Sequence, residues 1–308
     1  MKASDILAKI DHTLLSATAT TQQIDTLCEE AIACKTAAVC IPPCYVNYAA
    51  QKYGKKLKIA TVIGFPLGYD TTISKVVSTR QAISDGADEV DMVLNISALK
   101  NGDAEYVTQE IAAVKSVVGE KILKVIIEAC YLTENEKITA CKCVTEGGAD
   151  FIKTSTGFGS GGATHEDVRL MAANIGPKVK IKAAGGISTV DDMKKYIEEG
   201  CSRIGASRAV KLLKDRVNED VENFAQVSGE NQNKLKTTEP APKISEEAAM
   251  NAAIMHISVN EQWPYGTMKK YWSEGNRLAI EYETGKVLYY ALEDDYWEPE
   301  NGWVILPK

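Results

Sequence analysis

The chain has 308 residues, of which 45% are hydrophobic and 25% charged, and its formal net charge is −7. This composition is typical of a globular protein, and the negative charge argues against nucleic acid and acidic membranes as partners. Because no stretch approaches the roughly 18–20 apolar residues of a membrane span, and no apolar leader opens the chain, we expect a cytoplasmic protein.

Eight short runs of apolar and β-branched residues follow one another from the start of the chain. Their centres lie near residues 11, 39, 61, 91, 126, 152, 182 and 204, at intervals of 22 to 35 residues. A parallel strand with its crossover helix takes about 30 residues. The spacing therefore predicts a (β/α)8 TIM barrel, with the reacting groups at the carboxyl ends of the strands. A doubly wound open sheet is the alternative, but the chain has no G-x-G-x-x-G turn to favour it.

The segments between the runs are typical of helices. One of them, TTISKVVSTRQAISDGA, carries apolar residues at Ile73, Val76, Val77 and Ile83 and predicts a helix that ends near Gly86.

The composition changes after residue 227. Residues 228–247 are polar and contain Pro240 and Pro242, which predicts a linker after a barrel domain of residues 1–227. Residues 248–308 hold all four tryptophans and predict a small α+β domain of unknown role. A helix is expected over 246–258, followed by hairpins around Thr284-Gly285 and Asn301-Gly302. The aromatic side chains serve either as the core of this domain or as a surface for a protein or ligand.

The eight cysteines all precede residue 202 and show neither a CxxC pair nor histidines at zinc spacing. We therefore predict free thiols and no metal site. His12 and His165 stand alone and are interpreted as structural.

Two lysines interrupt apolar strands in the second half of the barrel. Lys153 lies in GADFIKTSTGF and Lys182 in VKIKAAGGI, each followed by small residues. Burial and a neighbouring ammonium both lower the pKa of a lysine. Such a lysine becomes a neutral amine that can attack a carbonyl group. The pattern favours a Schiff-base nucleophile over two surface lysines.

Two carboxylates also interrupt predicted strands. Asp91 lies in ADEVDMVLN and Asp11 in KIDHTLL. A buried aspartate must be paired or hydrogen-bonded, so each is either structural or an acid/base group that orients a lysine. Asp88 and Glu89 are expected to be solvated at the strand entry.

Glycine-rich turns follow the last three strands, with the sequences STGFGSGGAT, AAGGIS and RIGAS. Glycine allows backbone N–H groups to approach an anion closely, and barrels often bind phosphate after strands seven and eight. These turns predict a phosphate site, with plain tight turns as the alternative.

Taken together, the segments resemble the deoxyribose-phosphate aldolase family over roughly residues 3–220. The matching segments, in chain order, are KIDHTLL, AAVCIPP, TVIGFPLG, GADEVDMVLN, KVIIEA, FIKTSTGF, IKAAGGI and RIGAS. The resemblance implies a lyase of deoxyribonucleotide catabolism that cleaves 2-deoxyribose 5-phosphate into glyceraldehyde 3-phosphate and acetaldehyde. It also implies a homodimer that works without a cofactor.

The resemblance assigns roles to individual residues. Lys153 takes the Schiff-base position, Lys182 that of the lysine that perturbs its pKa, and Asp91 that of the proton-relay carboxylate. Asp11 matches a carboxylate near the substrate hydroxyl or catalytic water. The positions that match substrate or phosphate binding are Cys40, Gly157, Gly185, Gly186, Gly205 and Ser207; Cys40 is better interpreted as a packed thiol.

Two features depart from the family pattern. Arg208 stands where many relatives carry a second serine, which leaves open an aldolase for another or an unphosphorylated substrate. The chain also continues beyond the barrel, where a tail tyrosine such as Tyr265 would have to take the place of the tyrosine that covers the site in some relatives. A regulator that binds a sugar phosphate without turnover is a further alternative, which Lys153, Lys182 and Asp91 argue against.

Overall fold

The computed structural model describes residues 1–221, 268–274, 277–282, 285, 287–293 and 296–299. The chain divides into two compact units, Met1–Ser228 and Gly229–Lys308. The predicted linker over 228–247, the predicted helix over 246–258 and Tyr265 lie outside the described residues. The domain boundaries taken from the sequence therefore stay a prediction.

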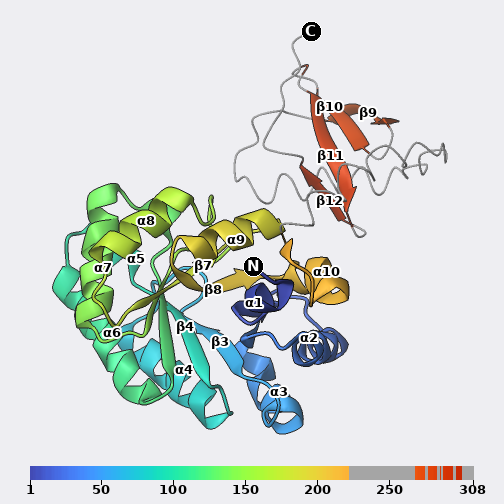
Figure 1. Cartoon of the computed structure of the whole chain (residues 1–308). Helices are drawn as coiled ribbons and strands as arrows, with labels where there is room; N and C mark the ends of the chain where they lie inside the picture. The colour runs from blue at the N-terminus through green and yellow to red at the C-terminus, as the bar shows by residue number, and fades with distance from the viewer. Residues whose placement is uncertain (222–267, 275–276, 283–284, 286, 294–295, 300–308) are drawn as a thin grey trace. The chain divides into compact units, whose positions relative to one another are not determined.

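The first unit is a closed barrel of eight parallel strands (Figure 1). Each strand pairs with the next along the chain, and the last pairs with the first through Ile10–Ile204 and His12–Ala206. This closure confirms the predicted (β/α)8 barrel and excludes the open sheet. The strands are β1 (Ile10–Thr13), β2 (Ala38–Ile41), β3 (Ile59–Ile63), β4 (Glu89–Val93), β5 (Ile122–Ile126), β6 (Phe151–Lys153), β7 (Lys180–Ala184) and β8 (Cys201–Ala206).

Helices surround the barrel and connect its strands (Figure 1). Among the described residues, none is long and apolar enough to cross a membrane. The α-helices are α1 (Ala3–Leu7), α2 (Thr21–Cys34), α3 (Val46–Tyr53), α4 (Thr72–Ser84), α5 (Ile96–Lys100), α6 (Ala104–Val118), α7 (Glu134–Glu146), α8 (His165–Asn174), α9 (Val190–Glu198) and α10 (Ala209–Leu213). Short 3-10 turns add η1 (Pro43–Tyr45), η2 (Ala129–Tyr131) and η3 (Lys214–Arg216).

Threonine hydroxyls fix the starts of five of these helices. Each threonine is the N-cap residue and accepts a hydrogen bond from the backbone N–H three residues later. Such a cap satisfies one of the unpaired donors of the first turn and contributes about 1 kcal/mol. Each cap therefore fixes the residue at which the loop after a strand ends and the next helix begins. The capping residues are Thr20, Thr71, Thr133, Thr164 and Thr189.

The barrel separates two kinds of core. Outward-facing strand residues such as Val90, Ile152 and Ile204 pack against the helices in one large apolar cluster. Inside the barrel, the second and third strands contribute only a small apolar cluster of Ala38, Cys40, Ala60 and Val62. Side chains alternate between the two faces of a strand. Alternation therefore turns the polar residues of the other strands inward, where they form the charged part of the interior.

Helix α4 occupies the predicted segment, but of its four apolar residues named above only Val76 and Ile83 pack against the core. Ile73 and Val77 are 76% and 56% exposed, whereas Lys75 is fully buried. The Lys75 ammonium lies 2.9 Å from a carboxylate oxygen of Glu110 and donates to the carbonyl of Gly68. A buried charge is tolerated only when it is paired and hydrogen-bonded, and this pair ties the loop after β3 to α6.

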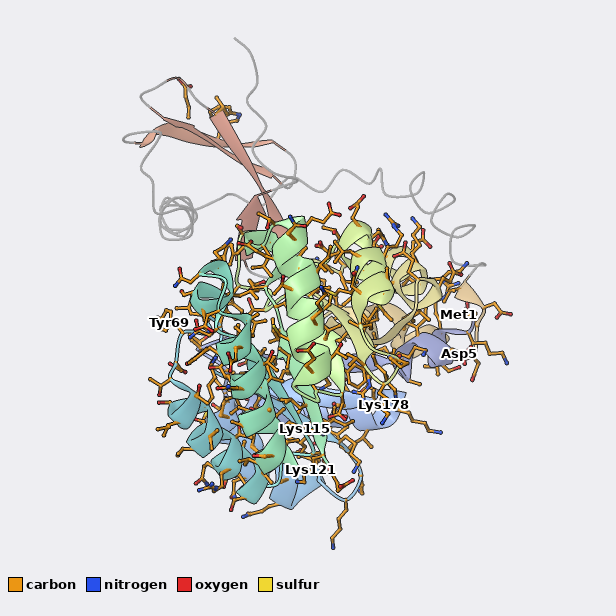
Figure 2. All side chains as sticks on the ribbon, turned by 90° about the vertical axis from the view of Figure 1, so that its left-hand side faces the viewer. Met1, Asp5, Tyr69, Lys115, Lys121 and Lys178 are labelled. Atoms are coloured by element: carbon orange, nitrogen blue, oxygen red, sulfur yellow. The ribbon has the colours of Figure 1, made fainter. Side chains whose placement is uncertain are left out.

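Figure 2 labels Lys115 and Lys121 at the end of the barrel where β5 begins. Lys115 donates to the carbonyl of Lys121 at 3.0 Å and to the Asp150 carboxylate at 2.7 Å. The same carboxylate accepts from the N–H of Leu123 at 2.8 Å. These bonds hold the start of β5 beside the start of β6, at the end of the barrel opposite the carboxyl ends of the strands.

The described part of the second unit is a four-stranded antiparallel sheet in the order β12-β11-β10-β9. The predicted hairpin around Thr284-Gly285 corresponds to the pairing of β10 with β11. The expected turn at Asn301-Gly302 lies outside the described residues. The strands are β9 (Met268–Glu274), β10 (Arg277–Tyr282), β11 (Val287–Glu293) and β12 (Tyr296–Pro299).

The buried ion pair of Lys75 and Glu110 predicts that substitution of Lys75 lowers the free energy of unfolding much more than substitution of an exposed lysine. Lys75→Met removes the ammonium and leaves the Glu110 carboxylate buried without its cation, which should cost about 3 kcal/mol or more. Lys58→Met is the control, because the Lys58 side chain is 65% exposed and its ion pair with Asp88 should contribute less than about 1 kcal/mol. Urea unfolding of both variants measures the difference. Equal losses of unfolding free energy would contradict this role of Lys75.

Candidate active site

Charged side chains from the later strands meet inside the barrel. The strand register places Lys153 directly beside Lys182, and Asp91 directly beside Lys124. The fifth member, Asp11, lies on β1, which closes the barrel against β8. All five side chains are at least 97% buried. The barrel therefore brings together four residues predicted from the sequence and adds Lys124 to them.

The Asp91 carboxylate is the centre of this group. Its Oδ2 accepts from the Nζ of Lys153 at 2.9 Å and from the Nζ of Lys182 at 2.7 Å. Its Oδ1 accepts from the Nζ of Lys124 at 2.8 Å. One carboxylate thus touches three lysines, and two of them share a single oxygen. Asp91 is a direct link between Lys153 and Lys182.

A second set of ion pairs lies next to the first. Lys182 also donates to Asp11 Oδ2 at 2.6 Å, and Lys124 lies 3.3 Å from the same oxygen. Arg203 joins Asp11 Oδ1 at 2.5 Å to the two carboxylate oxygens of Glu89, at 3.0 and 2.8 Å. Lys124 closes the set at 2.6 Å from Glu89 Oε2. Every charge in this second set is paired with at least two partners.

The surroundings affect Lys153 and Lys182 in opposite directions. Burial, together with the nearby Lys182 ammonium, lowers the pKa of Lys153 despite the attraction of Asp91. Burial also acts against the ammonium of Lys182, but the Asp11 and Asp91 carboxylates outweigh it and raise the pKa of Lys182. Lys153 is therefore the more easily deprotonated of the two amines, whereas Lys182 keeps its proton.

The carboxylates remain ionised for the complementary reason. Although burial alone would raise the pKa of Asp91, contact with Lys124, Lys153 and Lys182 holds it well below its usual value. The pKa of Asp11 is lowered in the same way, against burial, by Lys124, Lys182 and Arg203. Nearby opposite charges outweigh desolvation at both positions.

A pocket of about 300 Å³ is lined in part by Lys153. Among the described residues that line it, Lys153 alone carries a charged side chain. Gly157, Gly185 and Gly186 have positive φ angles of 87°, 88° and 72°, a backbone conformation that residues other than glycine rarely adopt. All but one of the predicted binding residues line this pocket, namely Gly157, Gly185, Gly186, Gly205 and Ser207.

Cys40 is the predicted binding residue that does not line the pocket. It is fully buried in the small apolar cluster inside the barrel. Burial, with Asp91 nearby, raises the pKa of its thiol to about 11, so the thiol is neutral at physiological pH. All eight cysteines are free thiols, as the sequence predicts.

Glu128 holds the loop that forms one wall of the pocket. Its carboxylate accepts from the N–H of Thr156 at 3.2 Å and from the Thr156 hydroxyl, which in turn accepts from the N–H of Phe158 at 3.0 Å. Glu128 itself has a φ of 48°, which is unfavourable for a residue other than glycine. These bonds fix the backbone on either side of Gly157.

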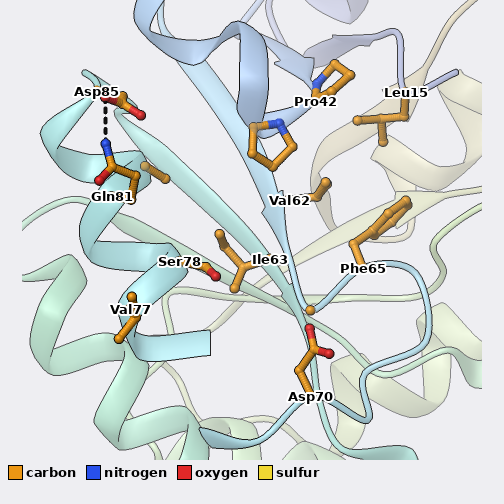
Figure 3. Close-up of a pocket in the computed structure, with 13 residues that line it drawn as sticks. Leu15, Pro42, Val62, Ile63, Phe65, Asp70, Val77, Ser78, Gln81 and Asp85 are labelled. Atoms are coloured by element: carbon orange, nitrogen blue, oxygen red, sulfur yellow. Dashed lines mark hydrogen bonds between the residues drawn. The ribbon is translucent and has the colours of Figure 1, made fainter. Parts of the chain in front are cut away.

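A second hollow of about 570 Å³ adjoins the pocket and shares Leu15 with it (Figure 3). Figure 3 shows Pro42, Val62 and Phe65 around its apolar part. The ring of Phe65 packs edge-on against Phe158 with 5.3 Å between the ring centroids. These two rings lie between the hollow and the pocket.

The remaining residues singled out in the sequence lie outside the pocket lining. His12 contacts Glu30 on α2 at 3.1 Å, and His165 contacts Glu199 at 2.7 Å and stacks on Tyr196. Arg208 is exposed at the start of α10.

The expectation that Glu89 is solvated is wrong. Glu89 is 2% exposed, because it lies two residues before Asp91 on β4 and shares its inward face. The two-residue spacing from Asp91 could have indicated from the sequence that Glu89 points into the barrel. The roles of Lys124 and Arg203 were also missed, although both stand inside the segments KVIIEA and RIGAS.

Comparison with known proteins gives the same family as the sequence motifs. Residues 6–216 match the family described as DeoC/LacD family aldolase. Two curated deoxyribose-phosphate aldolases are similar, from Clostridium botulinum (59% identity, 70% of this chain and 97% of the relative) and Clostridioides difficile (53%, 71% and 99%).

A solved structure supports the match. The deoxyribose phosphate aldolase of Aeropyrum pernix, described as a tetramer, has a TM-score of 0.63 at 30% identity and covers 73% of this chain and 93% of its own. The family match ends near the last helix of the barrel, so it does not extend to the second unit. Over its barrel, the chain belongs to the DeoC/LacD aldolase family and is a class I aldolase, a lyase.

Proposed function

We propose that the chain is a 2-deoxyribose-5-phosphate aldolase in which Lys153 forms the Schiff base. The observation that carries this proposal is the state of Lys153. It is the charged residue that lines the pocket, its pKa is lowered, and it touches a carboxylate that also touches Lys182. A neutral amine that lines a pocket can attack the aldehyde of a bound sugar.

The reaction begins when the Lys153 nitrogen attacks the C1 aldehyde of the open-chain sugar and forms a C–N bond. Loss of water leaves a protonated imine. The C2–C3 bond then breaks, its electron pair moves toward the imine nitrogen to give an enamine, and the C3 hydroxyl loses its proton. This step releases glyceraldehyde 3-phosphate. Protonation of the enamine carbon and hydrolysis of the resulting imine release acetaldehyde and restore the amine.

Asp91 and Lys182 are placed to move the protons. Asp91 Oδ2 lies within hydrogen-bond distance of the reacting nitrogen and of the Lys182 ammonium, so a proton that leaves one site can be replaced from the other. A positioned acid/base group contributes about 10²–10⁴-fold to such a step. Asp11 orients Lys182 through its 2.6 Å contact and holds it as a cation.

The glycine turns are the site for the phosphate group. Gly157, Gly185, Gly186, Gly205 and Ser207 line the pocket beyond Lys153, where backbone N–H groups and a hydroxyl can donate to an anion. Binding energy from the phosphate then positions the aldehyde at the lysine.

An aldolase for an unphosphorylated substrate is the second candidate. It is favoured by the pocket lining, which places Lys153 as its charged group among the described residues. With a phosphorylated substrate, and with Lys153 engaged in the imine, the neutral donors of the described lining would have to hold the whole phosphate charge. A cytoplasmic homodimer that needs neither cofactor nor metal remains a prediction under either candidate.

Borohydride reduction in the presence of deoxyribose 5-phosphate tests the nucleophile. We expect one reduced adduct, located on Lys153 by peptide mass spectrometry, and no adduct in Lys153→Ala. Lys180→Ala is the matched control, because Lys180 lies on β7 but is exposed at the other end of the strand. An adduct that persists in folded Lys153→Ala, or none on the unaltered protein, would overturn the assignment.

The substitution Gly162→Ala tests the phosphate site. A Cβ at this position would lie 2.3 Å from the carbonyl oxygen of Gly185, so the turn of Gly185 must shift. We expect kcat/KM for deoxyribose 5-phosphate to fall at least about tenfold, equivalent to about 1.4 kcal/mol, with little change for deoxyribose.

Gly161→Ala serves as the comparison, since its Cβ would meet the side chain of Cys130 at 3.1 Å instead of the pocket backbone. If Gly162→Ala lowers kcat/KM equally for both sugars, the turn does not bind phosphate. If the unaltered protein uses deoxyribose as well as its phosphate, the second candidate is favoured.

A further inference from the structure

We propose that Glu89, Lys124 and Arg203 are positioning residues that set the charge of the barrel interior, so that it is balanced only when Lys153 is a neutral amine. The inference rests on the proposed function of Lys153 as nucleophile. It concerns what keeps that nucleophile reactive, and it assigns a role to three residues that do not line the pocket.

The charged groups that ion pairs link to Lys153 come from most of the strands; the buried Glu128 carboxylate is bonded to Thr156 instead and is not among them. β1 contributes Asp11, β4 contributes Glu89 and Asp91, and β5, β7 and β8 contribute Lys124, Lys182 and Arg203. β2 adds the neutral thiol of Cys40, and β3 faces inward with Ala60 and Val62. Apart from Lys153, three cations therefore face three carboxylates, and each is paired within the group.

Balance among these six groups has a direct consequence for Lys153. Protonation of its amine would place one uncompensated positive charge in a space where every nearby group is buried. Such a charge is costly because the interior does not solvate it as water does. The Asp91 oxygen that Lys153 touches cannot offset this cost alone, since the same carboxylate is already shared by Lys124 and Lys182.

Lys124 connects the two sets of ion pairs. Its ammonium lies 2.8 Å from Asp91, 3.3 Å from Asp11 and 2.6 Å from Glu89. The three carboxylates outweigh its burial and raise its pKa, so Lys124 is a permanent cation. Glu89 in turn holds both Lys124 and Arg203. A change of charge at Glu89 or Lys124 therefore alters the electrostatic potential at Asp91 and, through Asp91, the ease with which Lys153 is protonated.

The strand register shows how Arg203 comes to join this group. The pairing of β7 with β8 is irregular between Ile181 and Lys182, so that Ile181 pairs with Cys201 while Lys182 pairs with Arg203. Cys201 and Ile204 both pack in the outer apolar cluster. The irregularity lets these two residues face outward while Arg203 reaches Asp11 and Glu89 inside the barrel.

The pH dependence of imine formation at Lys153 tests the inference through its sign. The rate of trapping with acetaldehyde and borohydride rises with pH as Lys153 loses its proton. Glu89→Gln removes a negative charge, further disfavours the ammonium, and should lower the midpoint by about one pH unit or more. Lys124→Met removes a positive charge and should raise the midpoint by a similar amount.

The double variant Glu89→Gln/Lys124→Met removes one charge of each sign and should return the midpoint to near the unaltered value. Lys58→Met is the control for loss of a surface lysine, and it should leave the midpoint unchanged. If Lys124→Met does not fold, Glu89→Gln and the double variant still test the sign, because the double variant leaves neither partner unpaired.

Midpoints that stay fixed, or that move in the same direction in both single variants, would overturn the inference. An adduct at Lys153 with unmoved midpoints would reject the charge balance and leave the proposed function intact. The absence of any Lys153 adduct in the unaltered protein would instead reject the function itself.

Discussion

The contact of a single carboxylate with three lysines is the interaction on which the rest of this site depends. Asp91 lies on β4, and its partners come from the next three strands along the chain. In the closed barrel, the inward-facing side chains of these four strands converge on one buried interior. In a flatter open sheet, side chains on strands two and three positions from β4 would lie about 10 and 14 Å from Asp91, too far for direct contact with one carboxylate.

Burial has different net effects on the pKa values of the two neighbouring lysines. It lowers the pKa of Lys153, which has one carboxylate partner, and fails to lower that of Lys182, which has two. The same desolvation thus leaves side by side one amine that loses its proton more easily than an ordinary lysine and one ammonium that keeps its proton more firmly. The difference follows from the number of carboxylates each ammonium touches.

Much of this arrangement could be predicted from the sequence. The eight strands were located because their residues are apolar at a regular interval, and Lys153, Lys182 and Asp91 stood out because charge interrupts a buried strand. Glu89 was misjudged because two acidic residues before a strand look like a solvated entry. Arg203 depends on an irregular strand register, and Lys75 on a partner 35 residues away, which no local pattern reveals. The DeoC/LacD family match covers residues 6–216 and so does not extend to the second unit.

NMR of protein labelled with 15N at the lysine side chains tests most directly whether Lys153 is neutral while its neighbours are charged. As the pH is raised, we expect the Lys153 signal, identified by its absence in Lys153→Met, to change from ammonium to neutral amine before the signals of the exposed lysines, while Lys124 and Lys182 remain ammonium. A Lys153 that keeps its proton as long as the exposed lysines do, or a Lys182 that loses its proton first, would contradict the account of how this barrel prepares its nucleophile.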